Sequence, residues 1–347
     1  MTGPGLQILM TSFYMPSESK IGVGHQVHLL ANQLVALGHE VTVATPCVAS
    51  VGATYMTLTL PVAGPARTFR WALRLRRLDL AGYDVLHAHG DDYWLWRRRV
   101  RAHVRTMHGS CLAEALRVPS GREKLRMVLL GLGELLATAV ADRTVAVSAN
   151  TTRWMPWVRQ VIPNGVDAAT LRGERTPSSH PSILFVGTYE NRKRGRLLTE
   201  AFARVVLPAR PDAELWMVCS DAPPAPQVTV LGRVESEELA RLYQSAWAFC
   251  LPSSYEGFGI PYVEALTAGL PVVATRNPGA TELAAQCPAI TLAPDDGVGA
   301  ALLRVLQQGP PDERSVGNAR ASAEPFDIEK VALAYVAVYR ELLERHP

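Results

Sequence analysis

Two glutamates in the stretch SSYEGFGIPYVEAL, Glu256 and Glu264, stand on either side of two glycines and a proline. An apolar run precedes them, and Pro261 suits the first turn of a helix, where a missing N–H costs nothing. The pattern predicts a strand, a loop over residues 257–260 and a helix whose first turn holds Glu264. Free amides at a helix N-terminus bind phosphate or carboxylate, and glycine lets a ligand approach the backbone. The two carboxylates could hold sugar hydroxyls beside such a phosphate site, or both could be ordinary helix-end acids.

A second loop concentrates positive charge. The run SILFVGTY predicts a strand, ENRKRG a loop and RLLTEAFARVVLPAR a helix, so Arg192 and Lys193 follow the end of a strand. A guanidinium and an ammonium in this place can neutralise a phosphate group. The alternative for these basic residues, and for Arg194 and Arg196 beside them, is a solvated turn.

Three histidines end two further predicted strands. His87 and His89 close YDVLHAH, and His108 closes VRTMHG. A histidine at a strand end is more often structural, and we interpret His87 and His89 in that way. The acidic pairs at 91–92 and 295–296 match no metal-ligand motif, and the five scattered cysteines lack the paired spacing of a zinc site, so no metal centre is expected.

The elements that position these residues alternate regularly between apolar strands and helices. Such alternation predicts parallel sheets covered on both faces, and the series starts again after residues 161–182, which are rich in turn formers. We therefore predict an α/β protein with two Rossmann-like, doubly wound domains, 1–165 and 166–326, facing across a cleft. Residues 327–347 carry an apolar helical stripe and should pack across to the first domain. Ligands of such sheets bind beyond the carboxyl ends of the strands.

Composition narrows the class of protein. The chain has 347 residues, of which 48% are hydrophobic and 19% charged, so an intrinsically disordered protein is excluded. A net charge of +3 is too small to indicate a nucleic-acid partner. The apolar stretch from Met127 is interrupted by Glu134 and is shorter than the ~20 residues of a membrane span, which predicts a buried helix. The first twenty residues do not resemble a signal peptide, so a cytoplasmic location is expected.

Arginine-rich windows gather in the first half of the chain, at residues 67–77, 97–105 and 117–126. Solvated helix faces are one explanation. The other is contact with an anionic acceptor or with the inner face of a membrane, through which the first domain would be held peripherally.

The glutamate stretch also carries a family resemblance. EGFGIPYVE resembles the E-x7-E signature of retaining glycosyltransferases of the GT-B fold, in particular family 4 of the glycosyltransferase classification. Further motifs that resemble the family occur in its order along roughly the whole chain. They are SKIGVGHQVHLLANQLVALGHEVTV, YDVLHAHG, RTMHG, VAVS with VIPNGVD, FVGTYENRKRG, and LGRVESEELARLYQSAWAFCLPSSYEGFGIPYVEALTAGLPVVAT.

The resemblance implies a role for each charged residue that matches it. Glu264 would hold the ribose of a nucleotide, and Glu256 would contact hydroxyls of the donor sugar. Arg192 and Lys193 would neutralise the diphosphate leaving group. His108 would contact the donor sugar from the first domain.

Other matching positions would bind the donor mainly through the backbone. Gly22 and Gly24 would leave room for phosphate and acceptor, and the chain from Gly232 to Val234 would receive the base. The amides near the sugar would be those of Gly257, Phe258, Gly259 and Ile260. Many relatives have an arginine directly after the glycine of the donor strand, whereas this chain has Thr188; Arg192 can replace that contact.

The function implied by the resemblance is a metal-independent, retaining transfer of a hexose-type residue to a hydroxyl acceptor, with no cofactor. The donor would be a UDP-, GDP- or dTDP-linked sugar. We favour a small natural-product or glycan intermediate of a GC-rich bacterium as acceptor, with a membrane lipid as the alternative. A GT-B epimerase or phosphorylase and a non-catalytic sugar-nucleotide-binding accessory protein also stay open. A Rossmann dehydrogenase is disfavoured because GVGHQV lacks the third glycine of its motif.

Overall fold

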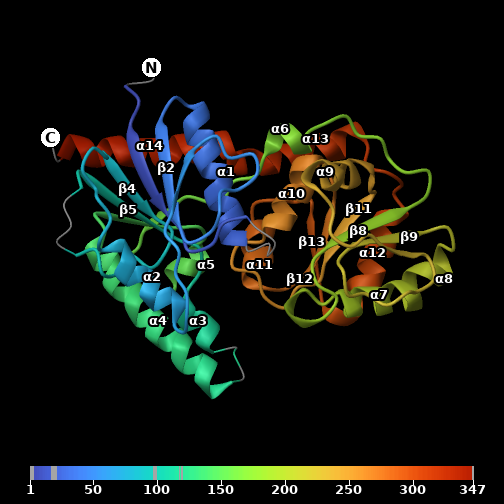
Figure 1. Ribbon diagram of the computed structural model, residues 1–347. Coiled ribbons are helices and arrows are strands. Elements are labelled where there is room, and N and C mark those ends of the chain that lie inside the picture. The colour runs from blue at the N-terminus through green and yellow to red at the C-terminus, as the bar shows by residue number, and fades with distance from the viewer. Residues whose placement is uncertain (1–3, 17–21, 97–99, 117, 119, 346–347) are drawn as a thin grey trace. The chain divides into compact units, whose positions relative to one another are not determined.

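The computed structural model describes residues 4–16, 22–96, 100–116, 118 and 120–345, and the chain divides into two compact units (Figure 1). Unit 1 comprises Met1–Gly165 together with Ile328–Pro347, and unit 2 comprises Val166–Asp327. Part of one predicted motif, residues 19–21, and the arginines at 97–99 and 117 lie outside the described residues. Both units are α/β with parallel strands.

Unit 1 contains, within the described residues, a seven-stranded parallel sheet in the order β3-β2-β1-β4-β5-β6-β7. The strands are β1 (Gln7–Thr11), β2 (Glu40–Thr45), β3 (Met56–Thr59), β4 (Val85–Ala88), β5 (Ala102–Met107), β6 (Arg143–Ala146) and β7 (Gln160–Val161). The sequence did not predict β3 and β7. β3 is a largely exposed edge strand and β7 has two residues, so neither shows the apolar run that marks a buried strand.

Helices cover both faces of this sheet (Figure 1). They are α1 (Gly22–Ala36), α2 (Arg67–Leu75), α3 (Cys111–Ala115), α4 (Gly121–Val140), α5 (Ala149–Thr152) and α14 (Ile328–Arg345). Successive β1 side chains point to opposite faces: Ile8 and Met10 join the core that includes α1 and α14, and Leu9 packs with Trp71 of α2. This two-sided burial explains why the strands are apolar throughout rather than alternating.

The apolar stripe predicted for the C-terminal helix is confirmed. Its seven members are all buried: Ile328, Val331, Ala332, Tyr335, Val338, Tyr339 and Leu342. Two of them also reach polar groups in the sheet. The Tyr335 hydroxyl is 2.8 Å from Thr106 Oγ1, and the Tyr339 hydroxyl is 2.6 Å from His87 Nδ1. The helix thus closes one face of the unit 1 sheet.

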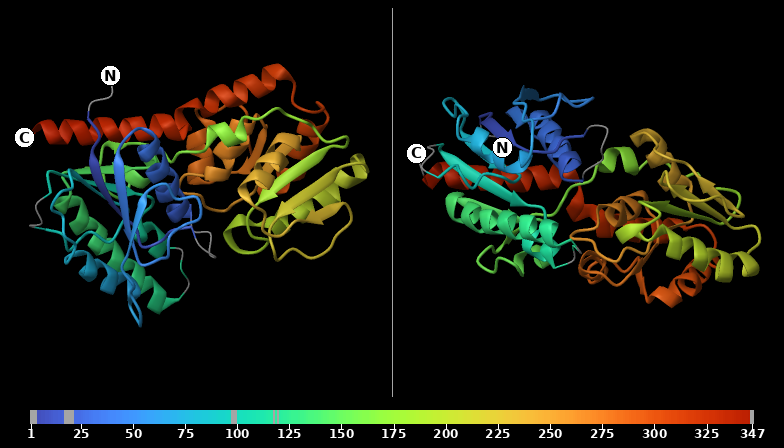
Figure 2. Two further views of the ribbon diagram at one scale, coloured as in Figure 1. Left: turned by 45° about the horizontal axis from the view of Figure 1, so that its top comes forward. Right: turned by 60° about the horizontal axis from the view of Figure 1, so that its bottom comes forward.

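Unit 2 contains, within the residues described, a six-stranded parallel sheet in the order β10-β9-β8-β11-β12-β13. The strands are β8 (Ser182–Val186), β9 (Glu214–Val218), β10 (Val228–Val230), β11 (Ala248–Leu251), β12 (Val272–Thr275) and β13 (Ile290–Ala293). All six fall on apolar runs that predict strands: SILFVGTY, AELWMVCS, VTVLG, WAFCLPS, PVVAT and AITLA. Figure 2 shows these strands side by side with helices around them.

The helices of unit 2 follow the strands in the expected alternation. They are α6 (Ala168–Leu171), α7 (Gly195–Ala201), α8 (Leu207–Ala209), α9 (Ser236–Ser245), α10 (Ile260–Ala268), α11 (Pro278–Ala284), α12 (Val298–Leu306) and α13 (Glu313–Ala323), with short 3₁₀ turns at Asn191–Lys193, Asp295–Gly297 and Glu324–Phe326. A π-helical turn, Phe202–Val206, joins α7 to α8. The predicted helix over 196–210 is therefore one continuous element with a wider turn at its centre.

The prediction of a buried helix around Met127 is wrong in its burial. α4 covers this stretch, but four leucines spaced along one side are exposed by 47–60%: Leu125, Leu129, Leu132 and Leu136. Leu130 and Ala137 face inward instead. The stretch is apolar on two sides, and the sheet covers only one of them. No helix of the described chain is long and apolar enough to cross a membrane.

Candidate functional site

Two loops of unit 2 meet at the carboxyl ends of adjacent strands. β8 and β11 pair in parallel, so the loop after each emerges at the same edge. The Ser254 amide and the Ser253 hydroxyl both donate to the carbonyl oxygen of Arg192, at 2.8 and 2.9 Å. Hydrogen bonds therefore join the basic loop, which follows β8 and contains Arg192 and Lys193, to the glutamate loop, which follows β11 and contains Glu256.

Glu256 forms the centre of this junction. Its side chain is 6% exposed, and one carboxylate oxygen lies 2.8 Å from Lys193 Nζ and 3.0 Å from a terminal nitrogen of Arg192. Burial opposes ionisation, but the two cations outweigh it and lower the pKa of Glu256. Burial lowers the pKa of Lys193, although Glu256 acts in the opposite direction. The solvated alternative for Glu256 is wrong, and the structure brings together three residues that the sequence singled out.

The helix after this loop begins as predicted, with Pro261 in its first turn. Gly259 is its N-cap residue with φ +99°, and a Cβ there would lie 2.4 Å from the Tyr262 ring, so glycine is required. Glu264 is the fifth residue of α10, and at 3.6 residues per turn it falls in the second turn rather than the first. There its carboxylate accepts a 3.0 Å hydrogen bond from the buried hydroxyl of Tyr243.

Other predicted donor-binding residues surround the same edge of the unit 2 sheet. Thr188 is exposed just after β8, and its hydroxyl donates to the carbonyl of Glu190 at 2.9 Å. Gly232 has φ +66° and follows β10, with Val234 two residues later. The loop before α10 contains Gly257, Phe258 and Gly259, and Ile260 begins the helix. The Gly279 amide holds this loop at its start by donating to the Glu256 carbonyl at 2.9 Å.

Two residues of this site escaped the sequence interpretation. Arg194 is not a solvated turn residue: with φ +54° it donates to the Pro252 carbonyl and to the Asp295 carboxylate, and so braces the glutamate loop. Tyr243 orients Glu264 from α9. The sequence offers no signal for either, because one looks like any basic turn and the other like any aromatic residue of a helix.

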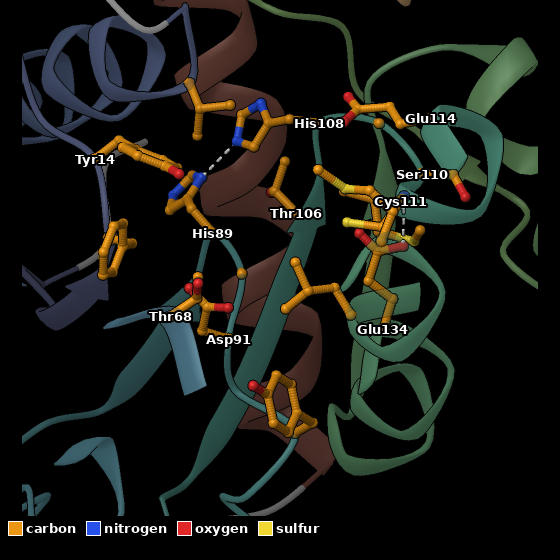
Figure 3. A pocket seen from close by; sticks show the side chains of 18 of the residues that line it. Tyr14, Thr68, His89, Asp91, Thr106, His108, Ser110, Cys111, Glu114 and Glu134 are labelled. Atoms are coloured by element: carbon orange, nitrogen blue, oxygen red, sulfur yellow. Dashed lines mark hydrogen bonds between the residues drawn. The ribbon is translucent and has the colours of Figure 1, made fainter. Parts of the chain in front are cut away.

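Unit 1 carries a separate pocket of about 260 Å³ at the carboxyl ends of β1, β4 and β5 (Figure 3). Its lining includes Tyr14, His89, Asp91, His108 and Glu134. Glu134 comes from α4, and the other four residues follow the neighbouring strands β1, β4 and β5. The carboxyl edge of this sheet is therefore hollowed, as expected for a ligand site in a doubly wound fold.

A histidine pair forms part of the pocket wall. His89 Nδ1 and His108 Nε2 are 2.9 Å apart, a hydrogen bond drawn in Figure 3. Burial lowers the pKa of His108 to about 4 and that of His89 well below its usual range, so both rings are neutral near pH 7. The structural interpretation of His87 is confirmed by its bonds to Thr106 and Tyr339, whereas His89 faces the pocket.

Gly22, Gly24 and Asp92 of unit 1 have structural explanations. A Cβ on Gly24 would lie 2.8 Å from the Met15 backbone, so α1 packs directly against the loop after β1. Gly22 is the first residue of that helix. Asp92 is buried in an ion pair with Arg105, and it lies 3.1 Å from Nε2 of His103, which burial keeps neutral by lowering its pKa to about 4. No group of three His, Cys, Asp or Glu side chains among the described residues could hold a metal ion.

Two glycosyltransferase family models match successive parts of this chain. A model described as Glycosyltransferase Family 4 matches residues 21–170, and one described as Glycosyl transferases group 1 matches residues 180–308. The O-antigen chain mannosyltransferase B of Escherichia coli is 29% identical over 46% of this chain and 45% of its own length. The chain matches about half the length of the first curated relatives.

Solved structures show the same fold. Sucrose-phosphate synthase from Thermosynechococcus elongatus matches with a TM-score of 0.76 at 21% identity, covering 97% of this chain and 99% of that one. The Anabaena protein HepE, in complex with UDP-glucose, matches with a TM-score of 0.75 at 15% identity, covering 97% and 100%. At these identities the likeness establishes the fold alone.

Proposed function

We propose that the two units, which share the GT-B fold, form a glycosyltransferase of family 4 that moves a hexose-type residue from a nucleoside diphosphate sugar to a hydroxyl acceptor. The observation that carries the proposal is the cluster of Arg192, Lys193 and Glu256 beside the N-terminus of α10. Two cations and free helical amides at one edge suit a diphosphate.

The donor would lie along the carboxyl edge of the unit 2 sheet. Lys193 and Arg192 would turn from Glu256 toward the diphosphate, and Glu256 would then accept hydrogen bonds from the sugar. Glu264, held by Tyr243, would accept from the ribose hydroxyls. The chain from Gly232 to Val234 would receive the base. The Anabaena relative bound to UDP-glucose supports a nucleotide-sugar donor.

Breaking the bond between sugar and diphosphate places negative charge on the leaving oxygen. Arg192, Lys193 and the amides at the start of α10 would stabilise that charge without a metal ion. Retention of the anomeric configuration would follow from attack on the same face that the diphosphate leaves, with its oxygen taking the acceptor proton. His108 is neutral near pH 7, so it would assist as a hydrogen-bonding group rather than as a cation.

The favoured acceptor is a small natural-product or glycan intermediate, bound in the pocket of unit 1. One observation favours a second candidate, a lipid acceptor: the four leucines Leu125, Leu129, Leu132 and Leu136 form an exposed apolar stripe on α4. An exposed stripe of this kind suits contact with a bilayer surface.

The test is a transfer assay with UDP-, GDP- and dTDP-linked hexoses and a panel of hydroxyl acceptors. We expect release of one nucleoside diphosphate that depends on acceptor, and a product whose anomeric configuration, read by NMR, matches the donor. Lys193→Ala should slow release strongly. Arg196→Ala is the matched control, because Arg196 belongs to the same loop but pairs with Glu190 instead of Glu256. Donor binding without release, with every acceptor, would contradict catalysis and favour an accessory protein.

A further inference from the structure

The pocket of unit 1 is lined by more acid than its own chain compensates. Five acidic or basic residues line it: Asp91, Glu114, Glu134, Arg105 and Arg126. Both arginines are already paired with acids outside the lining. Arg105 donates to Asp92, and Arg126 donates to Glu123 at 2.9 Å. Three carboxyl groups are left facing the pocket.

Asp91 is the most exceptional of the three. It has φ +61°, a conformation uncommon for residues other than glycine, and it follows Gly90 directly after β4. Its carboxyl group makes no hydrogen bond or ion pair with any residue that the structure describes, and burial raises its pKa to about 7. A strained, desolvated acid that faces a cavity is a candidate for ligand binding.

Glu134 supplies a second carboxyl group from the opposite wall. Figure 3 shows Asp91 beside Thr68 on one side of the pocket and Glu134 beside Cys111 on the other. One oxygen of Glu134 accepts a 3.0 Å hydrogen bond from the Cys111 amide. Burial raises the pKa of Glu134 as well. Arg105 attracts both acids and opposes these shifts, but its hydrogen bond goes to Asp92, and neither acid forms an ion pair among the described residues. A buried carboxylate is stabilised chiefly by a cationic partner.

The histidine pair adds an independent sign of a missing ligand. His89 is 8% exposed and lines the pocket, yet its Nε2 has no hydrogen-bond partner in the described chain. Buried polar atoms of this kind are normally satisfied, so a ligand with hydroxyl or amine groups is expected beside them. The aromatic rings of Phe13, Tyr14 and Tyr93 in the lining suit the apolar face of a sugar or cyclitol ring.

We propose that the pocket between Asp91 and Glu134 binds the acceptor, and that this acceptor is a hydroxyl-rich ring bearing a positively charged amine and no phosphate. This inference rests on the proposed function, because it names the substrate class of that reaction. The ammonium would pair with the two carboxylates, and ring hydroxyls would reach His89 and His108. A phosphate or carboxylate on the acceptor would meet three acids, while the two arginines of the lining already donate to Asp92 and Glu123 and leave Nε of Arg105 as a buried donor without a partner in the described chain.

The test uses three matched probes on the full chain: glucosamine, glucose and glucose 6-phosphate, titrated at pH 7, where the amine of glucosamine is mostly protonated, with binding followed by protein NMR. We expect glucosamine to bind at least ~10-fold more tightly than glucose, since an amine pair in a desolvated site is worth about one such factor, and glucose 6-phosphate more weakly than either. Asp91→Asn and Glu134→Gln should each remove the preference for glucosamine. Asparagine tolerates the Asp91 backbone conformation, and glutamine keeps an acceptor for the Cys111 amide.

Glu40→Gln is the control, because Glu40 is an exposed acid at the start of β2 outside the pocket lining. It should leave all three affinities unchanged. Equal binding of glucose and glucosamine, tighter binding of the phosphate, or no binding of any probe would overturn the proposal. Nucleoside diphosphate binding by the same preparation, measured separately, distinguishes this failure from a failure of the donor site.

Discussion

Each unit carries buried acids at the carboxyl edge of its sheet, but the two edges treat them in opposite ways. In unit 2, Glu256 lies within 3.0 Å of two cations, and its pKa is lowered. In unit 1, Asp91 makes no ion pair within the residues described, and its pKa is raised to about 7. One edge therefore holds basic groups in place for an anion, whereas the other holds acids that form no ion pair among the described residues.

This difference indicates which ligand charge each edge would bind. A carboxylate that pins Lys193 and Arg192 keeps them ordered before the diphosphate arrives, which reduces the reorganisation needed during the reaction. A carboxyl group that is desolvated and unpaired destabilises the empty protein and gains most from a cationic ligand. The same residue type thus serves as an internal counter-ion in one unit and as a binding group in the other.

The largest effect should come from a substitution in the unit 2 cluster of Arg192, Lys193 and Glu256. Lys193→Ala removes a cation that faces the leaving group and leaves Glu256 with Arg192 alone. We expect the transfer rate to fall by ~10²–10³-fold, the usual loss when one group that stabilises transition-state charge is removed. Rates are measured by nucleoside diphosphate release. An unchanged rate would show that this cluster does not serve the reaction.

At the unit 1 edge, the raised pKa of Asp91 predicts that the stability of the folded protein depends on pH. Because the pKa of Asp91 is raised from 3.8 to about 7 in the folded protein, the folded state binds the proton more tightly and stability falls as pH rises through this window. Asp91→Asn removes the penalty, which amounts to at most ~1.4 kcal/mol per pKa unit. Urea unfolding should show the variant gaining on the wild type between pH 4 and 7 and holding a constant lead above pH 8. If the stability of the variant exceeds that of the wild type by the same amount at pH 4 and pH 8, Asp91 does not carry the raised pKa.

A backbone substitution sharpens the account of the unit 2 edge. Gly259→Ala forces a side chain into positive φ against the Tyr262 ring, and we expect ~1–3 kcal/mol of destabilisation. Nucleotide affinity should fall as well, because the start of α10 moves. Gly317→Ala is a helical control, since a Cβ there meets no atom within 4 Å; equal stability of the two variants would sink the strain argument.

The smallest effect concerns the orientation of Glu264. Tyr243→Phe deletes one hydrogen bond to this carboxylate and leaves the ring packing intact. We expect ~1 kcal/mol of stability to be lost, the usual worth of one such bond. Nucleotide affinity should weaken several-fold if Glu264 holds the ribose. A stability loss with no change in affinity would leave Glu264 with a structural role only.

Much of the fold was predictable because its signals are local. Apolar runs such as AFCL and VVAT marked the strands of unit 2, and proline with glycine marked the start of α10. The meeting of Lys193 with Glu256 followed from strand adjacency, since both loops leave the same edge. The exposed edge strand β3 and the two-residue β7 carried no comparable pattern.

What the sequence missed depends on long-range contacts. His89 was interpreted as structural, and only its neighbour His108 on the next strand shows that it lines the pocket. Asp91 and Glu134 are far apart in the sequence and become opposite walls only through the packing of α4. Glu264 was predicted in the first turn of the helix, but it lies in the second, because the helix begins at Ile260, four residues before it.

The most direct test of the central claim, a donor site on unit 2, is a thermal-shift panel with UDP, GDP and dTDP. A bound nucleotide stabilises the folded state by mass action, so we predict a rise in Tm with one of the three. That rise should disappear in Lys193→Ala and Glu264→Ala and persist in Arg196→Ala. No rise with any nucleoside diphosphate, from a folded sample, would contradict the assignment of Arg192, Lys193, Glu256 and Glu264 to a donor site.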